Sequence, residues 1–492
     1  MAASRLAHKR PRGRHEGVIP LVLDLDGTIV ASDTLIECAL RLLASNPLAL
    51  LRALPLALTN RAAFKHRLAT LAHLSPATLP YNQAVLDLAQ TARAEGRQIY
   101  LATAADSRMA QAVGDHLAIF DGVIASDGQT NLKAETKAQA LVARFGRAGF
   151  DYAGDTTADL PVWAQARRAI VIAPSPALLA QATRANPNLE TLGARLSWPA
   201  RARLLARALR LHQWAKNSLI FVPVLAAHRA QPAVLGQAAI AFLAFSLCAS
   251  SVYLLNDLLD LPHDRAHATK RRRPFASGAL DVRWAAALIP ALLATALTAA
   301  AALPGAFLSM LAAYYVTTLA YSFVLKRRSV WDVITLAGLY TLRIFAGAAA
   351  TTIPISPWLL AFSLFLFFCL AVVKRLTELT LFLRTAPVRA TLSGRGYGAE
   401  DLDMLRSMAA SSGYMAVLVL ALYINSAEVL PLYRTPSALW VLCPILLFWI
   451  SRVLMISNRG QMNDDPVIFA LRDRVSLLAG LACLCAFVAA SL

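Results

Sequence analysis

The stretch AAIAFLAFSLCASSVYLLNDLLDLPHDR, residues 238–265, joins an uncharged apolar run to a cluster of acidic residues. The run, residues 238–255, approaches the length of about 20 residues that crosses a bilayer as a helix. Similar runs recur from about residue 217 onward in this chain of 492 residues, which is 57% hydrophobic. Before residue 217, charged and apolar residues mix as they do in a globular protein. The sequence therefore predicts a soluble N-terminal part and an all-α polytopic membrane part.

The membrane part is predicted to contain nine transmembrane helices, near residues 217–228, 234–255, 284–302, 305–325, 331–350, 357–373, 411–426, 437–456 and 475–491. The net charge is +19, and the basic residues concentrate on one side of these spans, whereas the opposite loops carry only Arg229 and Arg434. By the positive-inside rule, this asymmetry predicts a multi-pass protein of the inner (cytoplasmic) membrane, with its N-terminal domain and active sites in the cytoplasm. Charge distributed in this way gives no reason to expect a nucleic-acid partner. No signal peptide is evident, and the six cysteines lack ligand spacing, so neither disulfides nor a zinc site is expected.

The soluble part places acidic residues where predicted strands end. Residues 18–25 form a buried-strand pattern that leads into a turn at Gly27. Further strands are predicted in QIYLATAA (98–105), FDYAGDTTAD (150–159) and AIVIAP (169–174), with helical stretches between them. Alternating strands and helices predict a doubly wound parallel sheet, whose ligands bind at the carboxyl ends of the strands.

Four motifs in this part, DLDGT (24–28), Thr103, Lys137 and GDTTAD (154–159), follow the order seen in the haloacid dehalogenase (HAD) superfamily of phosphatases, which residues 17–185 resemble. The resemblance implies an α/β HAD-like (Rossmannoid) domain. In it Asp24 would be the nucleophile that forms an aspartyl-phosphate, and Asp26 the acid/base. Thr103 and Lys137 would bind phosphoryl oxygens. The implied Mg²⁺ site is a carboxylate set: Asp24, Asp26, Asp155 and Asp159. The chemistry agrees, because a carboxylate nucleophile splits phosphoryl transfer into two steps.

A helical insertion at about residues 31–95 is predicted to close this site as a cap. Its cations Arg61, Lys65 and Arg67 either contact substrate or form a solvated helix face, and the solvated face is the favoured interpretation. For the whole domain, the alternative is a retained fold without activity, against which the intact motifs speak.

The acidic cluster after the apolar run has the spacing of a cation site. Asn256, Asp260 and Asp264 are four residues apart, which would stack them on one face of a continuous helix, with Asp257 on a neighbouring face. Oxygen ligands without cysteine or histidine in register suit a hard cation such as Mg²⁺. Carboxylates with a metal beside basic groups form a diphosphate site, whereas a purely structural motif would need only one of the two. The basic residues that follow are Arg265, Lys270, Arg271, Arg272 and Arg273.

The pattern NxxxDxxxD resembles the first motif of the UbiA family of membrane prenyltransferases. RLHQWAKN (210–217) resembles the entry sequence of the same family, which implies that Lys216 and Asn217 lie at the mouth of the first helix. The resemblance covers about residues 205–492. It implies the UbiA fold of nine helices and is compatible with a homo-oligomer.

One region departs from the family pattern. Members carry a second aspartate-rich motif after the fourth helix, whereas here only Asp332 remains, behind the cations of 326–328. Fewer carboxylates and more cations favour a more anionic set of ligands. Arg343 lies three helical turns after Asp332, and it is either a functional residue or a packing partner of Asp332.

Further matches resemble the branch of the family typified by decaprenyl-phosphate phosphoribosyltransferase, in YSFVLK (321–326), LRIFAGAAATTIPIS (342–356), KRLTEL (374–379) and DDPVIFALRDRV (464–475). In that branch a polyprenyl phosphate in the bilayer is the acceptor and phosphoribosyl pyrophosphate (PRPP) is the donor. The resemblance implies that Asp260 and Asp264 act in catalysis through Mg²⁺. It also implies a set of phosphate- or ribose-binding residues: Arg265, Lys270, Arg271, Arg273, Tyr321, Lys326, Arg343, Lys374 and Arg375. For Lys374, a surface pair with Glu378 stays open.

The predicted domain order is a basic arm (1–16), the HAD-like domain (17–190), a linker or interfacial helix (191–209) and the transferase domain (210–492). The two chemistries together predict a two-step enzyme: phosphoribosyl transfer to polyprenyl phosphate, then hydrolysis of the 5-phosphate, for synthesis of a pentose donor of the cell envelope. Two alternatives stay open. One is a prenyltransferase that moves a polyprenyl group from its diphosphate to an aromatic acceptor, and the other is a non-catalytic membrane anchor for the phosphatase.

Overall fold

The computed structural model describes residues 18–127, 129–267, 269–384, 396–427, 429, 431–462 and 465–491. The chain forms two compact units. The first holds the residues up to Ala208 together with Asp257–Ala285, and the second holds Leu209–Asn256 and Ala286–Leu492. The predicted basic arm (1–16) and Asp464 of the last matching motif lie outside the described residues.

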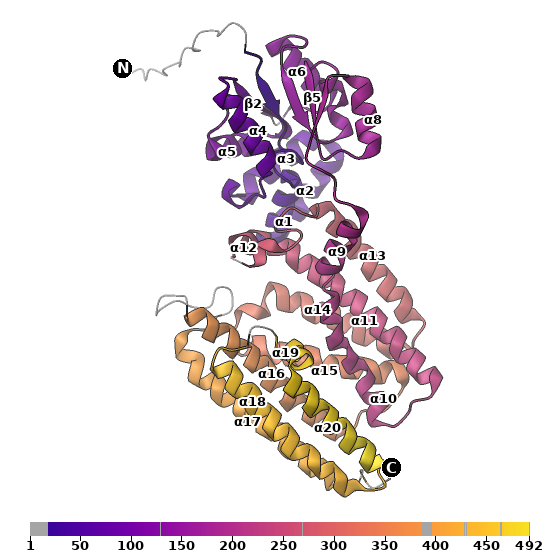
Figure 1. Ribbon diagram of the computed structural model, residues 1–492. Coiled ribbons are helices and arrows are strands. Elements are labelled where there is room, and N and C mark those ends of the chain that lie inside the picture. Colours follow the sequence, from indigo (N-terminus) through magenta and orange to yellow (C-terminus); the bar gives the residue numbers. More distant parts are fainter. Residues whose placement is uncertain are drawn as a thin grey trace. The chain divides into compact units, whose positions relative to one another are not determined.

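A six-stranded parallel sheet organises the first unit, with the strand order β3-β2-β1-β4-β5-β6 (Figure 1). The strands are β1 (Leu21–Leu23), β2 (Ile99–Asp106), β3 (Gly122–Ser126), β4 (Asp151–Gly154), β5 (Arg168–Ile172) and β6 (Leu189–Leu192). The four predicted strands are confirmed, and β3 and β6 are additional. Both are short and lack a fully buried apolar run, which is why the sequence pattern did not reveal them.

Strand β1 occupies the centre of this order, between β2 and β4, with Leu21 in register with Ile99 on one side and Asp151 on the other. The order in which the chain adds strands reverses between β1 and β4: β2 and β3 lie on one side of β1, and β4, β5 and β6 lie on the other. In a doubly wound sheet the loops that follow such strands separate and leave a crevice at the carboxyl edge. The loop after β1 carries Asp24 and Asp26, and the loop after β4 carries Asp155.

Both faces of the sheet are covered, which explains the continuous apolar composition of its central strands. Leu21 and Leu23 pack into one core, while Val22 packs with Tyr152 and Trp163 into the other, because successive strand residues point to opposite faces. The covering helices are α4 (Gln83–Ala94), α5 (Ser107–Leu117), α6 (Glu135–Phe145), α7 (Leu160–Trp163) and α8 (Pro176–Ala185). Beyond β6, helix α9 (Trp198–Ala208) lies within the predicted linker.

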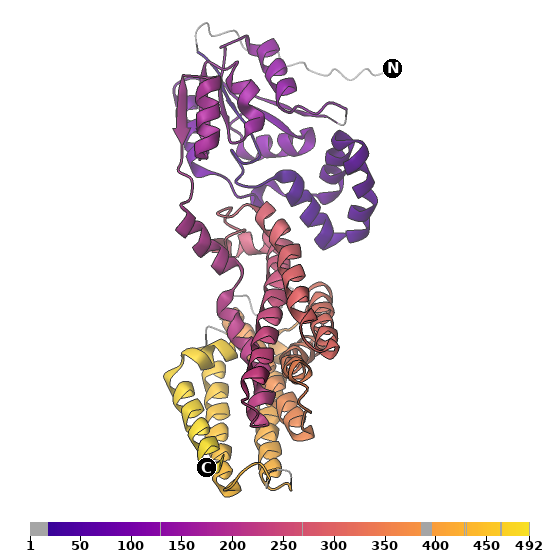
Figure 2. The ribbon, with the colours of Figure 1, turned by 90° about the vertical axis from the view of Figure 1, so that its right-hand side faces the viewer.

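The predicted cap consists of three helices between β1 and β2: α1 (Thr34–Ser45), α2 (Pro47–Thr59) and α3 (Arg61–Ala72). Figure 2 shows them as a group beside the sheet. Asp33, Asn46 and Asn60 each accept a main-chain N–H at the start of one of these helices, which fixes where it begins. Helix α4 lies inside the range expected for the cap, but it contacts β2 and belongs to the layer that covers the sheet.

The segment Asp257–Ala285 belongs to the first unit and contains α12 (Leu261–Ala266) and the turn η4 (Lys270–Arg272). Arg265 of α12 donates to both carboxylate oxygens of Glu37 in α1, at 3.0 and 2.7 Å, and to the carbonyl of Thr78 at 3.1 Å. Glu37 is buried and also accepts a 2.6 Å hydrogen bond from Ser32. A bidentate pair between buried groups ties this segment to the first cap helix.

The second unit is helical. Counted by length and composition over the described residues, eight helices can cross a membrane: α11 (Pro232–Leu259), α13 (Val282–Ala301), α14 (Gly305–Phe323), α15 (Trp331–Thr351), α16 (Pro357–Leu383), Ala399–Ile424 with α17, Pro436–Asn458 with α18, and α20 (Arg474–Ser491). Figure 2 shows α18 and α20 running side by side, and the two helices are in contact. The chain is therefore a multi-pass membrane protein.

The first of the nine predicted spans, 217–228, is the one that differs. The structure has the tightly wound stretch η3 (Leu211–Phe221) there, followed by the short helix α10 (Val222–Ala226). Polar side chains in η3 have tertiary partners, since Asn217 donates to Ser246 at 2.9 Å and Trp214 donates to Ser250 at 2.9 Å. The apolar composition predicted a membrane span here, but the structure has a shorter segment, which these two hydrogen bonds hold against α11. Gly347 of α15 lies directly against the backbone of Ile220, where a side chain would not fit.

Candidate active sites

The loop after β1 aims two carboxylates at the crevice of the first unit. The main-chain N–H of Asp24 donates to the carbonyl of Ala153 at 3.0 Å, which fixes the loop to β4. Gly27 follows with φ +76°, and a side chain there would collide with the carboxylate of Asp155. Only glycine takes this turn without cost, so the motif needs Gly27 to bring Asp24 and Asp155 together.

Lys137 joins these carboxylates from α6. Its ammonium group lies 3.1 Å from Asp24 Oδ1 and 3.4 Å from Asp159 Oδ1, and it donates to the Tyr152 hydroxyl at 2.8 Å. Lys137 is buried, so its charge is stabilised mainly by these two carboxylates. Thr103 is also buried and lies in the second half of β2, where its hydroxyl accepts from the N–H of Ala105 at 3.0 Å. The structure thus brings Asp24, Thr103, Lys137 and Asp159 to one edge of the sheet.

Three carboxylates here have the donor set for a divalent cation. Asp24, Asp155 and Asp159 each place an oxygen within 4.8 Å of the others. Asp155 Oδ1 is buried and has no hydrogen-bond partner in the described part of the chain, as expected of an atom that binds a cation. Asp159 already accepts from Tyr152 at 2.8 Å and from the Thr156 N–H at 3.2 Å, so it supports the loop more than it offers free oxygens. Asp26, included in the predicted metal set, accepts from the Thr34 N–H at 2.7 Å and lies outside this group of three.

Burial dominates the electrostatics of the site. It raises the pKa of Asp24 to about 6 against the opposing effect of Lys137, and that of Asp155 to about 8 with help from Asp24 and Asp159. Burial and the nearby Asp33 raise the pKa of Asp26 to about 7. Excess negative charge is relieved when a cation binds. A carboxyl group that titrates near neutrality also suits proton transfer, the role predicted for Asp26.

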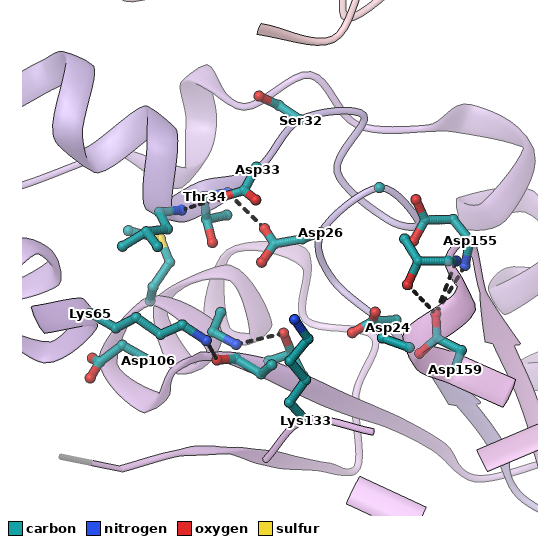
Figure 3. A pocket seen from close by; sticks show the side chains of 18 of the residues that line it. Asp24, Asp26, Ser32, Asp33, Thr34, Lys65, Asp106, Lys133, Asp155 and Asp159 are labelled. Carbon is teal, nitrogen blue, oxygen red and sulfur yellow. Dashed lines mark hydrogen bonds between the residues drawn. The ribbon is translucent and has the colours of Figure 1, made fainter. Parts of the chain in front are cut away.

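These residues line a cavity of about 910 Å³ (Figure 3). The sheet edge forms one wall, and cap residues that include Arg61, Phe64 and Lys65 form another. Arg67, two residues on, is exposed and does not line the cavity. Residues Asp281 and Arg283 of the segment Asp257–Ala285 complete the lining, and their side chains pair with each other at 2.5 Å. The cavity has room for a substrate much larger than phosphate.

The acidic motif after the apolar run is bent. Helix α11 ends at Leu259 and α12 begins at Leu261, so Asn256, Asp260 and Asp264 do not share one continuous helix, contrary to the prediction from their spacing. Pro262 explains the break, because it lacks an N–H and its ring clashes with the carbonyl four residues earlier. Within the first unit, Arg273 Nη1 bonds both Asp257 (3.1 Å) and Asp264 (2.6 Å), whose side chains are buried.

The predicted basic residues of this segment separate into different roles. Arg273 bonds the acidic motif, whereas the guanidinium of Arg265 is occupied by Glu37 and by main-chain carbonyls. Lys270 and Arg271 are exposed on the turn η4. Lys326 is half-buried in the turn η5 (Leu325–Arg327) of the second unit.

In the second unit, Asp332 has a partner that the sequence did not suggest. Arg375 bonds both of its oxygens, one at 3.0 Å and the other through Nε, and both side chains are fully buried. The Tyr321 hydroxyl also donates to Asp332, at 2.8 Å, and Arg375 pairs in addition with Glu378. Tyr321 and Arg375, which were both predicted to bind phosphate or ribose, therefore bond the same carboxylate, that of Asp332.

Arg343 is not the partner of Asp332. Its Nε donates to Asn217 Oδ1 at 2.8 Å, its Nη1 donates to the carbonyl of Leu339, and its guanidinium lies over the ring of Phe245. The two predicted site residues Asn217 and Arg343 are therefore in direct contact.

A cationic pair surrounds Asp465, a residue without a predicted role. Lys216 lies 2.8 Å and Lys374 3.0 Å from Asp465 Oδ2, and the Tyr340 hydroxyl donates to Oδ1 at 3.3 Å. The ion pair of Lys374 is thus with Asp465, while Glu378 bonds Arg375. Asp465 belongs to the matching motif at 464–475, and only its charge beside that resemblance could have drawn attention to it.

Comparison with known proteins identifies the families of both domains. Residues 218–471, just over half of the chain, match the UbiA prenyltransferase family. The chain belongs to this family. Residues 21–163 match the haloacid dehalogenase-like hydrolases, so this family member carries a HAD-like domain fused before its membrane domain. It is an enzyme with a transferase and a phosphatase part.

Three relatives define its neighbourhood in the family. The uncharacterized protein y4nM of Sinorhizobium fredii is 39% identical over 477 residues, 96% of this chain and 91% of that protein, so the similarity includes both domains. The nodulation protein NoeC of Azorhizobium caulinodans is 37% identical over 275 residues, 55% of this chain and 88% of that protein. Decaprenyl-phosphate phosphoribosyltransferase of Mycobacterium tuberculosis is 32% identical over 286 residues, 56% of this chain and 91% of that protein.

Proposed function

We propose that this enzyme transfers the 5-phosphoribosyl group of PRPP to a polyprenyl phosphate such as decaprenyl phosphate, and that its HAD domain then hydrolyses the 5-phosphate of the product. The pathway would supply a pentose donor for the cell envelope. The similarity to decaprenyl-phosphate phosphoribosyltransferase supports the first step. The observation that carries it is the environment of Asp332. Because Arg375 and Tyr321 bond this carboxylate, the second acidic motif of a prenyl-diphosphate site has become a salt bridge.

In the transfer step, a phosphate oxygen of the lipid attacks C1 of the ribose. The bond from C1 to the pyrophosphate oxygen breaks, and pyrophosphate leaves with the electron pair. Mg²⁺ held by Asn256, Asp257, Asp260 and Asp264 would neutralise the charge on pyrophosphate. Lys270, Arg271 and Arg273 closely follow the acidic motif in the sequence. We therefore assign them to the binding of the anionic donor.

Lys216 and Lys374 suit the acceptor phosphate. Two ammonium groups share the single carboxylate of Asp465 and so keep a net positive charge. A phosphate monoester needs such a pair when it lies among apolar helices, since an unpaired charge is costly there. Lys326 is assigned to the acceptor phosphate from the resemblance alone, and Arg343 would position Asn217.

In the second step, a carboxylate oxygen of Asp24 attacks the phosphorus of the 5-phosphate, and the bond from phosphorus to the ribose oxygen breaks. Asp26 gives its proton to the departing oxygen. Water then attacks the aspartyl-phosphate with Asp26 as the base, which releases phosphate and restores Asp24. Thr103 and Lys137 bind the phosphoryl oxygens, and Mg²⁺ on Asp24 and Asp155, with Asp159 in support, would offset their charge. The charge asymmetry of the loops supports the proposal that both steps take place on the cytoplasmic side of the inner membrane, where the lipid would not need to cross the bilayer between them.

Mass spectrometry of lipid products tests the proposal. Purified full-length protein receives PRPP, Mg²⁺ and polyprenyl phosphate, and we expect polyprenyl-phosphoryl-ribose without a 5-phosphate. The Asp24→Asn variant should accumulate the 5-phosphorylated lipid, and Asp260→Ala should form neither product. Identical lipids from the wild type and Asp24→Asn would refute the second step. Consumption of prenyl diphosphate with an aromatic acceptor, and none of PRPP, would identify a conventional prenyltransferase instead.

A further inference from the structure

The phosphatase cavity contains more cations than its phosphoryl-transfer site uses. Lys137 is neutralised by Asp24 and Asp159, and Arg283 is neutralised by Asp281. Lys65 of the cap helix α3 and Lys133 of the loop after β3 also line the cavity. In the described ranges of the chain, neither has a carboxylate within ion-pair distance. Figure 3 shows both on the side of the cavity away from Asp155 and Asp159.

Lys65 is held in place with bonding capacity to spare. Its ammonium group donates to the carbonyl of Ala104 at 2.7 Å and to Asn131 Oδ1 at 3.1 Å, and both acceptors are uncharged. An ammonium group has three N–H donors, so one is left for a ligand. The side chain is half-buried, and burial lowers its pKa, which shows that the surroundings do not fully compensate the charge. A cation fixed in this way favours an anionic ligand.

Lys133 reinforces the same region. Its N–H donates to the carbonyl of Asn131 at 2.9 Å, so the residue that receives Lys65 also orients the backbone at Lys133. The two ammonium groups are close enough that Lys133 contributes to the lowered pKa of Lys65. Lys133 is itself exposed, and the carboxylates of Asp26 and Asp33 act on Lys65 in the opposite sense. Burial still outweighs them, so an anion bound between the two lysines would stabilise the charge of Lys65 further.

We propose that Lys65 and Lys133 form a second anion subsite, and that the phosphatase takes phosphomonoesters whose alcohol part carries a further phosphate group, linked as a diester. Asp24 attacks the monoester while the diester lies against the two lysines. The cavity of about 910 Å³ has room for a pentose between them. The inference rests on the phosphatase half of the proposed function and names its substrate class. Lys65 and Lys133 are specificity residues, since neither lies at the reacting atoms.

Two synthetic, water-soluble substrates isolate the subsite. One is methyl ribofuranoside 5-phosphate, and the other has an ethyl phosphodiester in place of the methyl group at C1. With the full-length protein, we expect the diester substrate to have the lower KM and a similar kcat. Lys65→Gln should raise the KM of the diester substrate about 10- to 100-fold, the range for a lost charge-assisted hydrogen bond, and change the methyl riboside less than about 3-fold. Lys65→Arg should restore most of the preference.

Arg67→Gln is the matched control, because Arg67 lies on the same helix, is exposed and does not line the cavity. It should leave both KM values unchanged. If Lys65→Gln weakened both substrates equally, Lys65 would merely hold the cap on Asn131, and the subsite would be refuted. Equal KM values for the two substrates with the wild type would refute it as well. Hydrolysis of neither substrate would refute the phosphatase role along with the subsite. A diester preference in a protein that makes no lipid from PRPP would refute only the transfer step.

Discussion

Replacing Asp332 with asparagine tests whether this carboxylate stabilises the fold or binds a metal ion. The pair Asp332–Arg375 is fully buried, with one contact at 3.0 Å. At an effective dielectric constant of about 20, two unit charges at this distance attract by about 5.5 kcal/mol. Removing one member of a buried pair costs about 3–5 kcal/mol, because the remaining charge loses its partner. Here Glu378 still pairs with Arg375, so we expect the lower end, about 3 kcal/mol, and a fall in unfolding midpoint of about 6–12 °C.

The assay combines thermal unfolding of the detergent-solubilised protein, followed by intrinsic fluorescence, with the Mg²⁺ concentration that gives half-maximal transfer. Asp332→Asn should lower the midpoint and leave the Mg²⁺ requirement unchanged. Adding Arg375→Gln should recover most of the stability, since a neutral pair replaces an ion pair at little net cost. Asp260→Asn should behave oppositely and raise the Mg²⁺ requirement at a nearly unchanged midpoint. An unchanged midpoint with a raised Mg²⁺ requirement in Asp332→Asn would refute the salt-bridge interpretation and restore a second metal-binding motif.

Three further outcomes follow from the contacts. Asp151→Asn should destabilise the α/β unit by about 2–4 kcal/mol, because this buried carboxylate bonds Arg97 and Arg167. Burial by itself would raise the pKa of Asp151, but the bonds to the two arginines outweigh it and keep this pKa low. Its stabilisation is therefore present above about pH 4 and lost as pH falls through the folded-state pKa, so urea unfolding should show the deficit of the variant shrinking below pH 4. Gly27→Ala should abolish phosphate release and spare lipid transfer, as its φ of +76° and the Asp155 carboxylate leave no room for a methyl group; normal phosphatase turnover would contradict this. Lys216→Met should raise the KM for polyprenyl phosphate about 10-fold or more with an unchanged KM for PRPP, and an equal rise in both would contradict the acceptor role.

The soluble domain was largely predictable because its chemistry is local. The residues of DLDGT and GDTTAD directly follow buried strands, and parallel strands bring their carboxyl ends to one edge. Strand ends therefore predicted Asp24 and Asp155, whereas Lys137, which lies on helix α6, was implied only by the resemblance to the HAD superfamily. It did not reveal that Lys65 faces the cavity, because a lysine on a solvated helix face and one on a pocket wall have the same periodicity.

The membrane domain was predictable in its helices and less so in its polar contacts. In the described part of the chain, eight of the predicted apolar runs lie in helices long enough to cross a membrane, since a segment that crosses hydrocarbon must satisfy its own backbone bonds. The remaining predicted span, 217–228, is instead the end of η3 followed by the short helix α10, and Asn217 at its start bonds Ser246. Pro262 in the acidic motif was a local signal for the bend, but the regular spacing of Asn256, Asp260 and Asp264 concealed it.

What the sequence by itself determined is the division into a soluble and a membrane part, the families of both and the carboxylates that cluster in the soluble domain. Runs of apolar residues and motifs at strand or helix ends record these features in consecutive positions. Only the tertiary structure decided which charges meet: Asp332 with Arg375 rather than Arg343, Lys374 with Asp465 rather than Glu378, and Arg265 with Glu37. Pairing of charges depends on distances between residues far apart in the chain, and a buried charge takes whichever partner the packing of the helices brings within reach.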